Sequence, residues 1–343
     1  MGAAAPLADS RMVALVMSTR SLLLWILALV VVSGGRPAFA VGEMPGGGNA
    51  DGKGATPYVL VLGVAQDGGT PQAGDKTHPG WSDPRLRRRV TCLAIVDPAA
   101  RPGRWLVDCT PDFREQLQAL DRAAPVEGTP GLAGIFLTHA HIGHYTGLMF
   151  LGHESMGARD VAVWAMPKMR SFLEAGGPWS QLVRYENIRL GTLEPGRAVV
   201  LNSRLRVTPF RVPHRQEYSE VVGYRIDGPN RSVLFIPDID QWEDWDAEGT
   251  RIEELIAGVD VAYLDGTFYA NGEIPGRDMS TFPHPFITHS MQRFASLPEK
   301  ERGKIRFIHL NHTNPALDPD SDARRTIERN GFHVAEEMER VDL

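Results

Sequence analysis

Ten short apolar runs constrain the fold of this 343-residue chain more than any other feature. Each run has four to eight residues, and most are rich in valine, isoleucine and leucine. That length and that content of β-branched side chains favour strands over helices. The predicted strands are residues 58–64, 90–96, 105–108, 134–138, 161–165, 205–212, 221–226, 232–236, 261–264 and 305–309.

Helical patterns stand between some of these strands but not between all of them. The segment 111–121 is the clearest, because Thr110 suits the N-cap and Pro111 the first helical position. Since several strands follow one another directly, we expect an α/β (α+β) fold: two mixed β-sheets flanked by helices, in one domain spanning residues 57–343. The other predicted helices are residues 145–151, 167–175, 285–296 and 320–329.

The N-terminus has the pattern of a secretory signal. Arg11 and Arg20 precede the apolar run 22–32, which is too short for the about 20 residues that span a bilayer. Ala38-Phe39-Ala40 supplies a small-x-small cleavage site. We therefore predict a signal peptide over 1–40 and a flexible glycine-rich linker over 41–56. The mature protein would be periplasmic or secreted, without stable membrane insertion; an uncleaved anchor is the alternative.

Composition narrows the class of partner. The chain has 36 Lys and Arg against 42 Asp and Glu, a net charge of −6, which argues against nucleic acid. We expect a small-molecule substrate, and the oligomeric state stays open. Cys92 and Cys109 both lie in apolar segments, so we expect two buried thiols, with a single bridge as the alternative. Neither has the paired spacing of a zinc–cysteine site.

Three of the eleven histidines follow one predicted strand within six residues. They form the segment His139-Ala-His141-Ile-Gly-His144, directly after residues 134–138. Residues two apart in extended backbone point to the same side, so His139 and His141 can converge on one ion. His144 can approach from another side, where the chain turns into a helix. This triplet indicates a metal site.

Further candidate ligands follow other predicted strands. His214 comes after strand 205–212, Asp238 after strand 232–236 and His312 after strand 305–309. If these strand ends meet at one rim of the sheets, the three side chains join the triplet. Asp240 is an alternative to Asp238.

The segment His139–His144 resembles the H-x-H-x-D-H signature of the metallo-β-lactamase superfamily. The resemblance covers the chain from Tyr58 onward and implies an αββα sandwich with one or two metal ions along the sheet rim. Carried over by position, His139, His141 and His214 would form one metal site. The second would contain His144 and His312, and Asp238 would bridge the two.

The chain departs from that signature at one position, because Gly143 stands where the family has aspartate. Glycine has no ligand, so we expect the second ion to bind more weakly than the first. Gly143→Asp is then expected to raise the stoichiometry towards two ions.

Five further segments, taken together, carry a narrower resemblance: Leu62–Gln72, Val107–Asp112, Leu264–Phe268, Gly276–Met279 and Asn311–Pro315. They resemble the pyrroloquinoline-quinone biosynthesis protein B branch of the superfamily. That branch has largely lost the histidine ligands, whereas His139, His141 and His312 are present here. Its cysteine-rich segment is replaced by residues 73–78, AGDKTH.

Three other residues are candidates for contacts around the site. Asp67 lies in a glycine-rich turn that lacks the Gly-Lys-Ser/Thr ending of a phosphate loop, so we expect it to line the pocket mouth. Asp265 ends a predicted strand and either orients a ligand imidazole or caps a turn. His284 either faces substrate or lies on a surface loop.

These observations favour a metal-dependent hydrolase. Its metal-activated water would attack a small ester, lactone or phosphoester, and Asp238 would position that water and take up protons. The cofactor is expected to be zinc, one or two ions, with iron or manganese possible. The alternatives are a non-haem iron oxygenase or oxidoreductase related to the biosynthetic branch, and a non-catalytic metal-binding relative.

Overall fold

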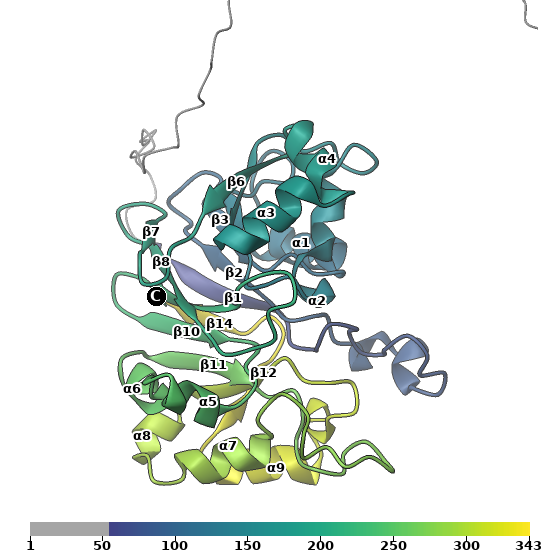
Figure 1. Cartoon of the computed structure of the whole chain (residues 1–343), viewed down its shortest axis with the longest axis vertical. Helices are drawn as coiled ribbons and strands as arrows, with labels where there is room; N and C mark the ends of the chain where they lie inside the picture. The colour runs from purple at the N-terminus through teal and green to yellow at the C-terminus, as the bar shows by residue number, and fades with distance from the viewer. Residues whose placement is uncertain (1–54) are drawn as a thin grey trace, which may run out of the picture. The chain divides into compact units, whose positions relative to one another are not determined.

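A computed structural model describes residues 55–343, in which fourteen strands form two seven-stranded sheets (Figure 1). The predictions for residues 1–40 and for most of the linker lie outside this range. The first sheet has the order β14 (Arg340–Asp342), β1 (Tyr58–Gly63), β2 (Cys92–Val96), β3 (Arg104–Val107), β4 (Gly134–Phe136), β5 (Val161–Ala165) and β6 (Ile188–Thr192). The second has the order β13 (His333–Val334), β12 (Ile305–Ile308), β11 (Val261–Asp265), β10 (Ser232–Ile236), β9 (Val222–Asp227), β8 (Arg206–Arg211) and β7 (Val199–Val200).

Both sheets are mixed. Strands β3 to β6 run parallel in the first sheet, and β10 to β13 run parallel in the second. The sheets face each other, and helices cover their outer faces (Figure 1). Helices α1 (Phe113–Ala123), α3 (Pro167–Ala175) and α4 (Trp179–Arg184) pack on the first sheet, while the second carries α5 (Trp242–Ala247), α6 (Ile252–Ala257), α7 (Ile287–Phe294), α8 (Glu299–Arg302) and α9 (Asp322–Arg329).

Side-chain alternation along β1 explains why the layers stack in this way. Val59 and Val61 join the core between the sheets, whereas Leu60 and Leu62 join the core under α1 and α3. Both faces of the strand are therefore apolar, as expected for a strand covered on both sides. The expected αββα sandwich of two mixed sheets flanked by helices is confirmed.

All ten predicted runs contain a strand, and the four strands that the sequence pattern missed are the four sheet edges, β6, β7, β13 and β14. An edge strand has a neighbour on one side only, and these four are short and partly exposed. Strands β6, β13 and β14 carry arginine, aspartate, histidine or glycine, and β7 is only two valines long, so the hydrophobic pattern does not reveal them.

Two predicted helices need correction. The first begins at Phe113, with Asp112 as its N-cap residue. The Thr110 hydroxyl accepts a hydrogen bond from the Asp112 amide and donates one to the Gln116 side chain, just ahead of the helix. The predicted helix 145–151 is instead a short α2 (Ile142–Tyr145) followed by a 3-10 turn over Thr146–Leu151.

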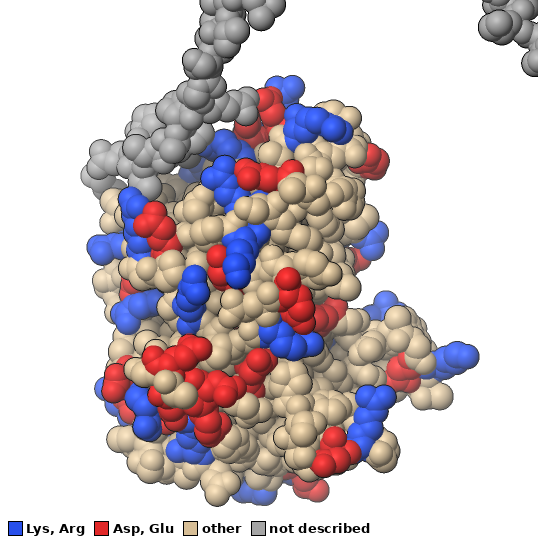
Figure 2. Space-filling view, viewed as in Figure 1, with Lys and Arg blue, Asp and Glu red and all other residues tan. Residues whose placement is uncertain are grey.

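The charged side chains are mixed in sign over the face seen in Figure 2, where acidic residues gather over α5 and α6. Cys92 and Cys109 are buried free thiols, as expected. Between residues 55 and 343, we find no helix that is both long and apolar enough to span a bilayer.

Candidate metal centre

Three histidines meet at the rim where β4 and β8 end. His139 and His141 follow β4, and His214 follows β8. Each offers one ring nitrogen, and these nitrogens lie within 4.8 Å of one another. His214 Nε2 is 3.2 Å from His141 Nδ1. The structure thus brings together the three residues predicted to share one ion.

A second cluster lies beside the first and consists of Asp67, His144 and His309. Their ligand atoms also lie within 4.8 Å of one another. Asp67 Oδ1 is 3.2 Å from His144 Nε2 and 3.5 Å from His309 Nε2. Two of these three residues were not expected as ligands, since Asp67 was predicted only to line the pocket mouth.

Asp238 lies between the two clusters. Its Oδ2 is 2.9 Å from His144 Nε2 and 3.5 Å from His309 Nε2, while its Oδ1 is 3.8 Å from His214 Nε2. The carboxylate therefore faces both halves, as a bridging ligand would. The alternative residue, Asp240, stands behind His214 and contacts its Nδ1 at 2.7 Å.

The far ring nitrogens of these histidines are held by oxygen atoms. Nδ1 of His144 contacts Asp108 at 2.7 Å, and Nδ1 of His139 contacts the Thr138 hydroxyl at 3.0 Å. That hydroxyl donates in turn to Asp108. Such contacts fix the orientation of the ring and aim its other nitrogen at the centre.

The second sheet repeats this arrangement. His309 Nδ1 contacts the Thr267 hydroxyl at 3.0 Å, and Thr267 donates to Asp265 at 2.8 Å. Asp265 thus helps to orient a candidate ligand imidazole, through Thr267. On the exposed side of the centre, His141 Nε2 contacts the Glu217 carboxylate at 3.0 Å.

The inward-facing atoms are those expected of metal ligands. Asp67 Oδ1 and the Nε2 atoms of His139, His144 and His309 are buried without a hydrogen-bond partner among the described residues. A buried polar atom without a partner costs about 1–3 kcal/mol. Such atoms, spread over the two neighbouring clusters, fit divalent cations, which would accept their lone pairs.

The electrostatics point the same way. Burial opposes charge on Asp238, yet the neighbouring imidazoles of His309, His214 and His144 hold its pKa well below the usual range. Burial also opposes charge on Asp67, but the neighbouring imidazoles of His144 and His309 bring its pKa well below normal. Burial lowers the pKa of His139, which keeps that ring neutral, as a ligand must be. In the ion-free protein, the neighbouring imidazoles supply the positive charge beside the two carboxylates. Burial opposes charge on His144, but Asp108, Asp238 and Asp67 raise its pKa well above the usual range.

The expectation for His312 is wrong in its geometry. The side chain lies away from both clusters, with Nδ1 4.0 Å from Asp75, and His309 stands beside His144 instead. His309 directly follows β12 and has a left-handed φ of 65°. A histidine at a strand end was a usable signal, but strand alternation does not reveal the turn that points this ring into the centre.

His284 is buried rather than on the loop surface. Its Nδ1 contacts Asp265 at 2.8 Å and lies 3.4 Å from Asp238 Oδ1. Burial opposes its charge, but Asp265 raises its pKa to about 9. In the ion-free protein, this raised pKa favours the protonated ring at neutral pH, next to the centre.

Sequence reasoning also missed Asp108, Thr138, Thr267 and Glu217. Asp108 directly follows β3, the same strand-end position that identified Asp238 as a candidate after β10. The two threonines and Glu217 carry no comparable signal: Glu217 meets His141 from 76 residues away, and each threonine also contacts a residue at least 30 positions distant.

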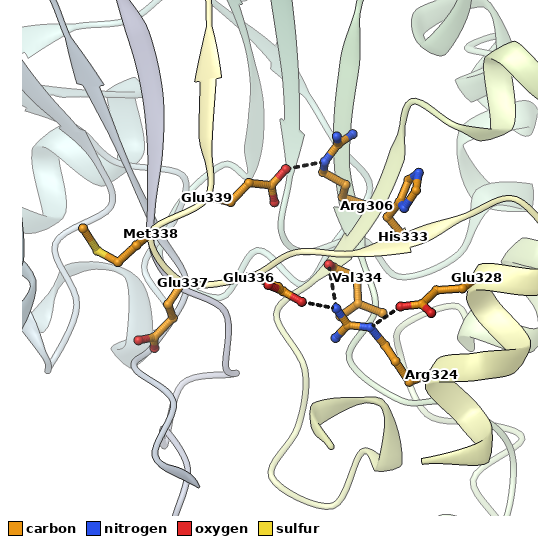
Figure 3. A pocket seen from close by; sticks show the side chains of 9 residues that line it. All are labelled: Arg306, Arg324, Glu328, His333, Val334, Glu336, Glu337, Met338 and Glu339. Atoms are coloured by element: carbon orange, nitrogen blue, oxygen red, sulfur yellow. Dashed lines mark hydrogen bonds and ion pairs between the residues drawn. The ribbon is translucent and has the colours of Figure 1, made fainter. Parts of the chain in front are cut away.

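A surface pocket of about 420 Å³ shares no residue with this centre (Figure 3). Arg306 pairs there with Glu339 at 2.5 Å, and Arg324 pairs with Glu336 at 2.6 Å. None of the buried unpartnered atoms found in residues 55–343 belongs to its lining. Its charges are already matched, so it does not resemble a metal site.

The fold and the donor set together define a class: proteins of the metallo-β-lactamase fold with a histidine–aspartate metal site at the sheet rim. Residues 103–312 match the β-lactamase superfamily domain model, and the chain belongs to that superfamily, in its PqqB-like branch.

Individual relatives support this assignment. Coenzyme PQQ synthesis protein B of Methylorubrum extorquens (strain PA1) is 27% identical over 316 residues, covering 83% of this chain and 100% of the relative. The crystal structure of Zn²⁺-bound PqqB from Methylobacterium extorquens has a TM-score of 0.68 and 24% identity, covering 83% of this chain and 100% of that one. The crystal structure of a diphosphatase from the PhnP family has a TM-score of 0.59 and 21% identity, covering 84% of this chain and 98% of that one.

Proposed function

We propose that this protein is a metal-dependent hydrolase that uses a metal-activated water on a small ester, lactone or phosphoester. The observation that carries the proposal is the convergence of five histidines and two aspartates, four of whose inward atoms are buried without partners among the described residues. A purely structural cluster would pair these atoms with one another or with neighbouring hydrogen-bond donors.

The donor set suits zinc, and also iron or manganese. Imidazole nitrogens bind all three metals, and a bridging carboxylate is a common feature of two-metal sites. The similarity to a structure described as Zn²⁺-bound PqqB supports zinc as the first metal to test. His139, His141 and His214 would hold one ion, and Asp238 would face both positions.

A bound divalent cation lowers the pKa of its water towards about 7 and polarises the oxygen of the bond to be cleaved. Asp238, buried between the two clusters, would help to hold the ions and would orient that water. His284 contacts Asp265 at 2.8 Å and lies 3.4 Å from Asp238. We assign to His284 the delivery of a proton to the leaving group.

A hollow of about 540 Å³ adjoins the exposed side of the centre and suits a small-molecule substrate. Glu217, which contacts His141, lies in its lining together with Lys168, Phe172 and Tyr218. The Phe172 and Tyr218 rings are 5.6 Å apart, and Tyr218 is 65% exposed. These rings could bind an apolar group of the substrate while Lys168 faces an anionic group. The mixed charges of Figure 2 favour such a substrate over nucleic acid.

The test is a panel of lactones, carboxylic esters and phosphodiesters, offered to the zinc-loaded protein. We expect turnover of at least one class, which the double variant His139→Ala/His141→Ala abolishes. His312→Ala is the matched control, because this histidine lies outside the clusters, and it should keep the rate. If no class is turned over above the double variant while zinc is bound, the protein is a metal-binding relative without hydrolase activity.

A second candidate function is an iron-dependent oxygenase or oxidoreductase. The 27% identity to a coenzyme PQQ synthesis protein B favours it, and the ligand types also suit non-haem iron. Oxygen uptake by the Fe²⁺-loaded protein, absent from the zinc-loaded form, would support this reading over hydrolysis.

We also propose export to the periplasm or the medium, from the signal pattern of residues 1–40. N-terminal sequencing of the native protein should begin at Val41, within a residue or two. A native chain that retains residues 22–32 would contradict cleavage.

A further inference from the structure

The glycine that breaks the family signature is required by space rather than by backbone conformation. Gly143 lies in α2, and its φ is outside the left-handed region that favours glycine. A Cβ at this position would stand 2.2 Å from Asp67 Oδ1 and 2.6 Å from Asp67 Cα. Any side chain here would therefore displace both the Asp67 carboxylate and its backbone.

Asp67 reaches this space from another part of the chain. It follows β1, and the neighbouring Gln66 amide donates to the Leu310 carbonyl at 2.8 Å. That contact fixes the Asp67 loop beside the segment that carries His309. The side chain is partly exposed as a whole, but its Oδ1 is buried, has no hydrogen-bond partner among the described residues, and faces His144 and His309.

We propose that Asp67 is the terminal carboxylate ligand of the second metal position, in place of the signature aspartate, and that Gly143 is the complementary change that admits it. The second position then has His144, His309, Asp67 and the bridging Asp238. It keeps two histidines and two carboxylates, so neither a donor nor a negative charge is lost. This revises the expectation that the second ion binds weakly and that Gly143→Asp adds a ligand.

The inference rests on the proposed function for the presence of a metal, but its test measures ion binding without turnover. Zinc is titrated into the ion-free protein by calorimetry, and bound zinc is counted by elemental analysis. We expect two ions in the unmodified protein. Asp67→Asn should weaken binding of the second ion by at least about tenfold and leave binding of the first ion unchanged. Asp75→Asn, in the same segment but outside the cluster, is the matched control and should bind like the unmodified protein.

The spatial argument is tested with a second pair. Gly143→Ala should lower the melting temperature and weaken the second ion, whereas Gly303→Ala, where a Cβ meets nothing closer than 3.4 Å, should do neither. The double variant Asp67→Gly/Gly143→Asp returns the carboxylate to the signature position and should bind the second ion more tightly than Asp67→Gly alone.

Two equally tight ions in a folded Asp67→Asn variant would overturn the inference, and so would a single ion in the unmodified protein. Two ions that depend on Asp67, without turnover of any ester, would instead uphold the inference and count against the hydrolase.

Discussion

The two halves of the metal centre are built in different ways. The three-histidine half takes His139 and His141 from one short segment after β4 and adds His214. The other half takes Asp67, His144 and His309 from three segments, which follow β1, β4 and β12. One half is largely local in sequence, and the other depends on the packing of distant strands.

The comparison shows that a missing signature residue does not mean a missing ligand. The local motif is broken at Gly143, in the half that contains His144. The Asp67 carboxylate, from the loop after β1, occupies the space that a side chain at position 143 would need. The two halves have different ligand charge, because the histidine half contains neutral rings and the other half contains an aspartate besides the shared Asp238. The following predictions probe this difference.

The largest effect is expected from Asp238→Ala, because Asp238 faces both halves. Binding of both ions should weaken by more than about 100-fold, beyond the loss seen when an outer contact is removed. Elemental analysis after dialysis measures it. Loss of one ion only would show that Asp238 belongs to a single half.

His214→Ala should remove the ion of the three-histidine half and leave the other. Since bound metal stabilises the folded state, the zinc-dependent rise in melting temperature should shrink as well. The matched control is His312→Ala, which should retain both ions. An unchanged zinc content in His214→Ala would break the assignment of this half.

Asp108→Asn should have a smaller effect, of about 10–100-fold, on the half that contains His144. Asp108 does not face the centre, but it contacts His144 Nδ1 at 2.7 Å. It also accepts a hydrogen bond from the Thr138 hydroxyl, which in turn contacts His139. Calorimetry should show the weaker affinity with stoichiometry retained at high zinc. If both ions bind equally more weakly, the contact of Asp108 with His139 through Thr138 matters as much as its direct contact with His144.

His284→Gln should have the smallest effect on ion binding, because His284 belongs to neither half, and should instead lower kcat. In the ion-free protein, its pKa is raised from 6.5 to about 9, since Asp265 outweighs burial. The stabilisation from this charge is complete below pH 6.5 and is lost as pH rises through about 9. Urea unfolding of the unmodified protein should show this loss, and the variant should not.

Much of the fold followed from the sequence because interior strands are apolar on both faces. Runs such as 58–64 and 232–236 stand out for that reason, and all ten predicted runs contain a strand. The edge strands did not stand out. A strand with one neighbour tolerates polar residues, as β6, β13 and β14 do, and β7 is only two residues long.

The three-histidine half was accessible from the sequence, because period-two geometry brings His139 and His141 together wherever the strand lies. The choice between His309 and His312 was not, since it depends on a left-handed turn after β12. Nor was the role of Asp67, which is set by the packing of the β1 loop against α2 and the segment after β12. Local periodicity determines which side chains share a face, but only the packed tertiary structure decides which carboxylate fills the space beside Gly143.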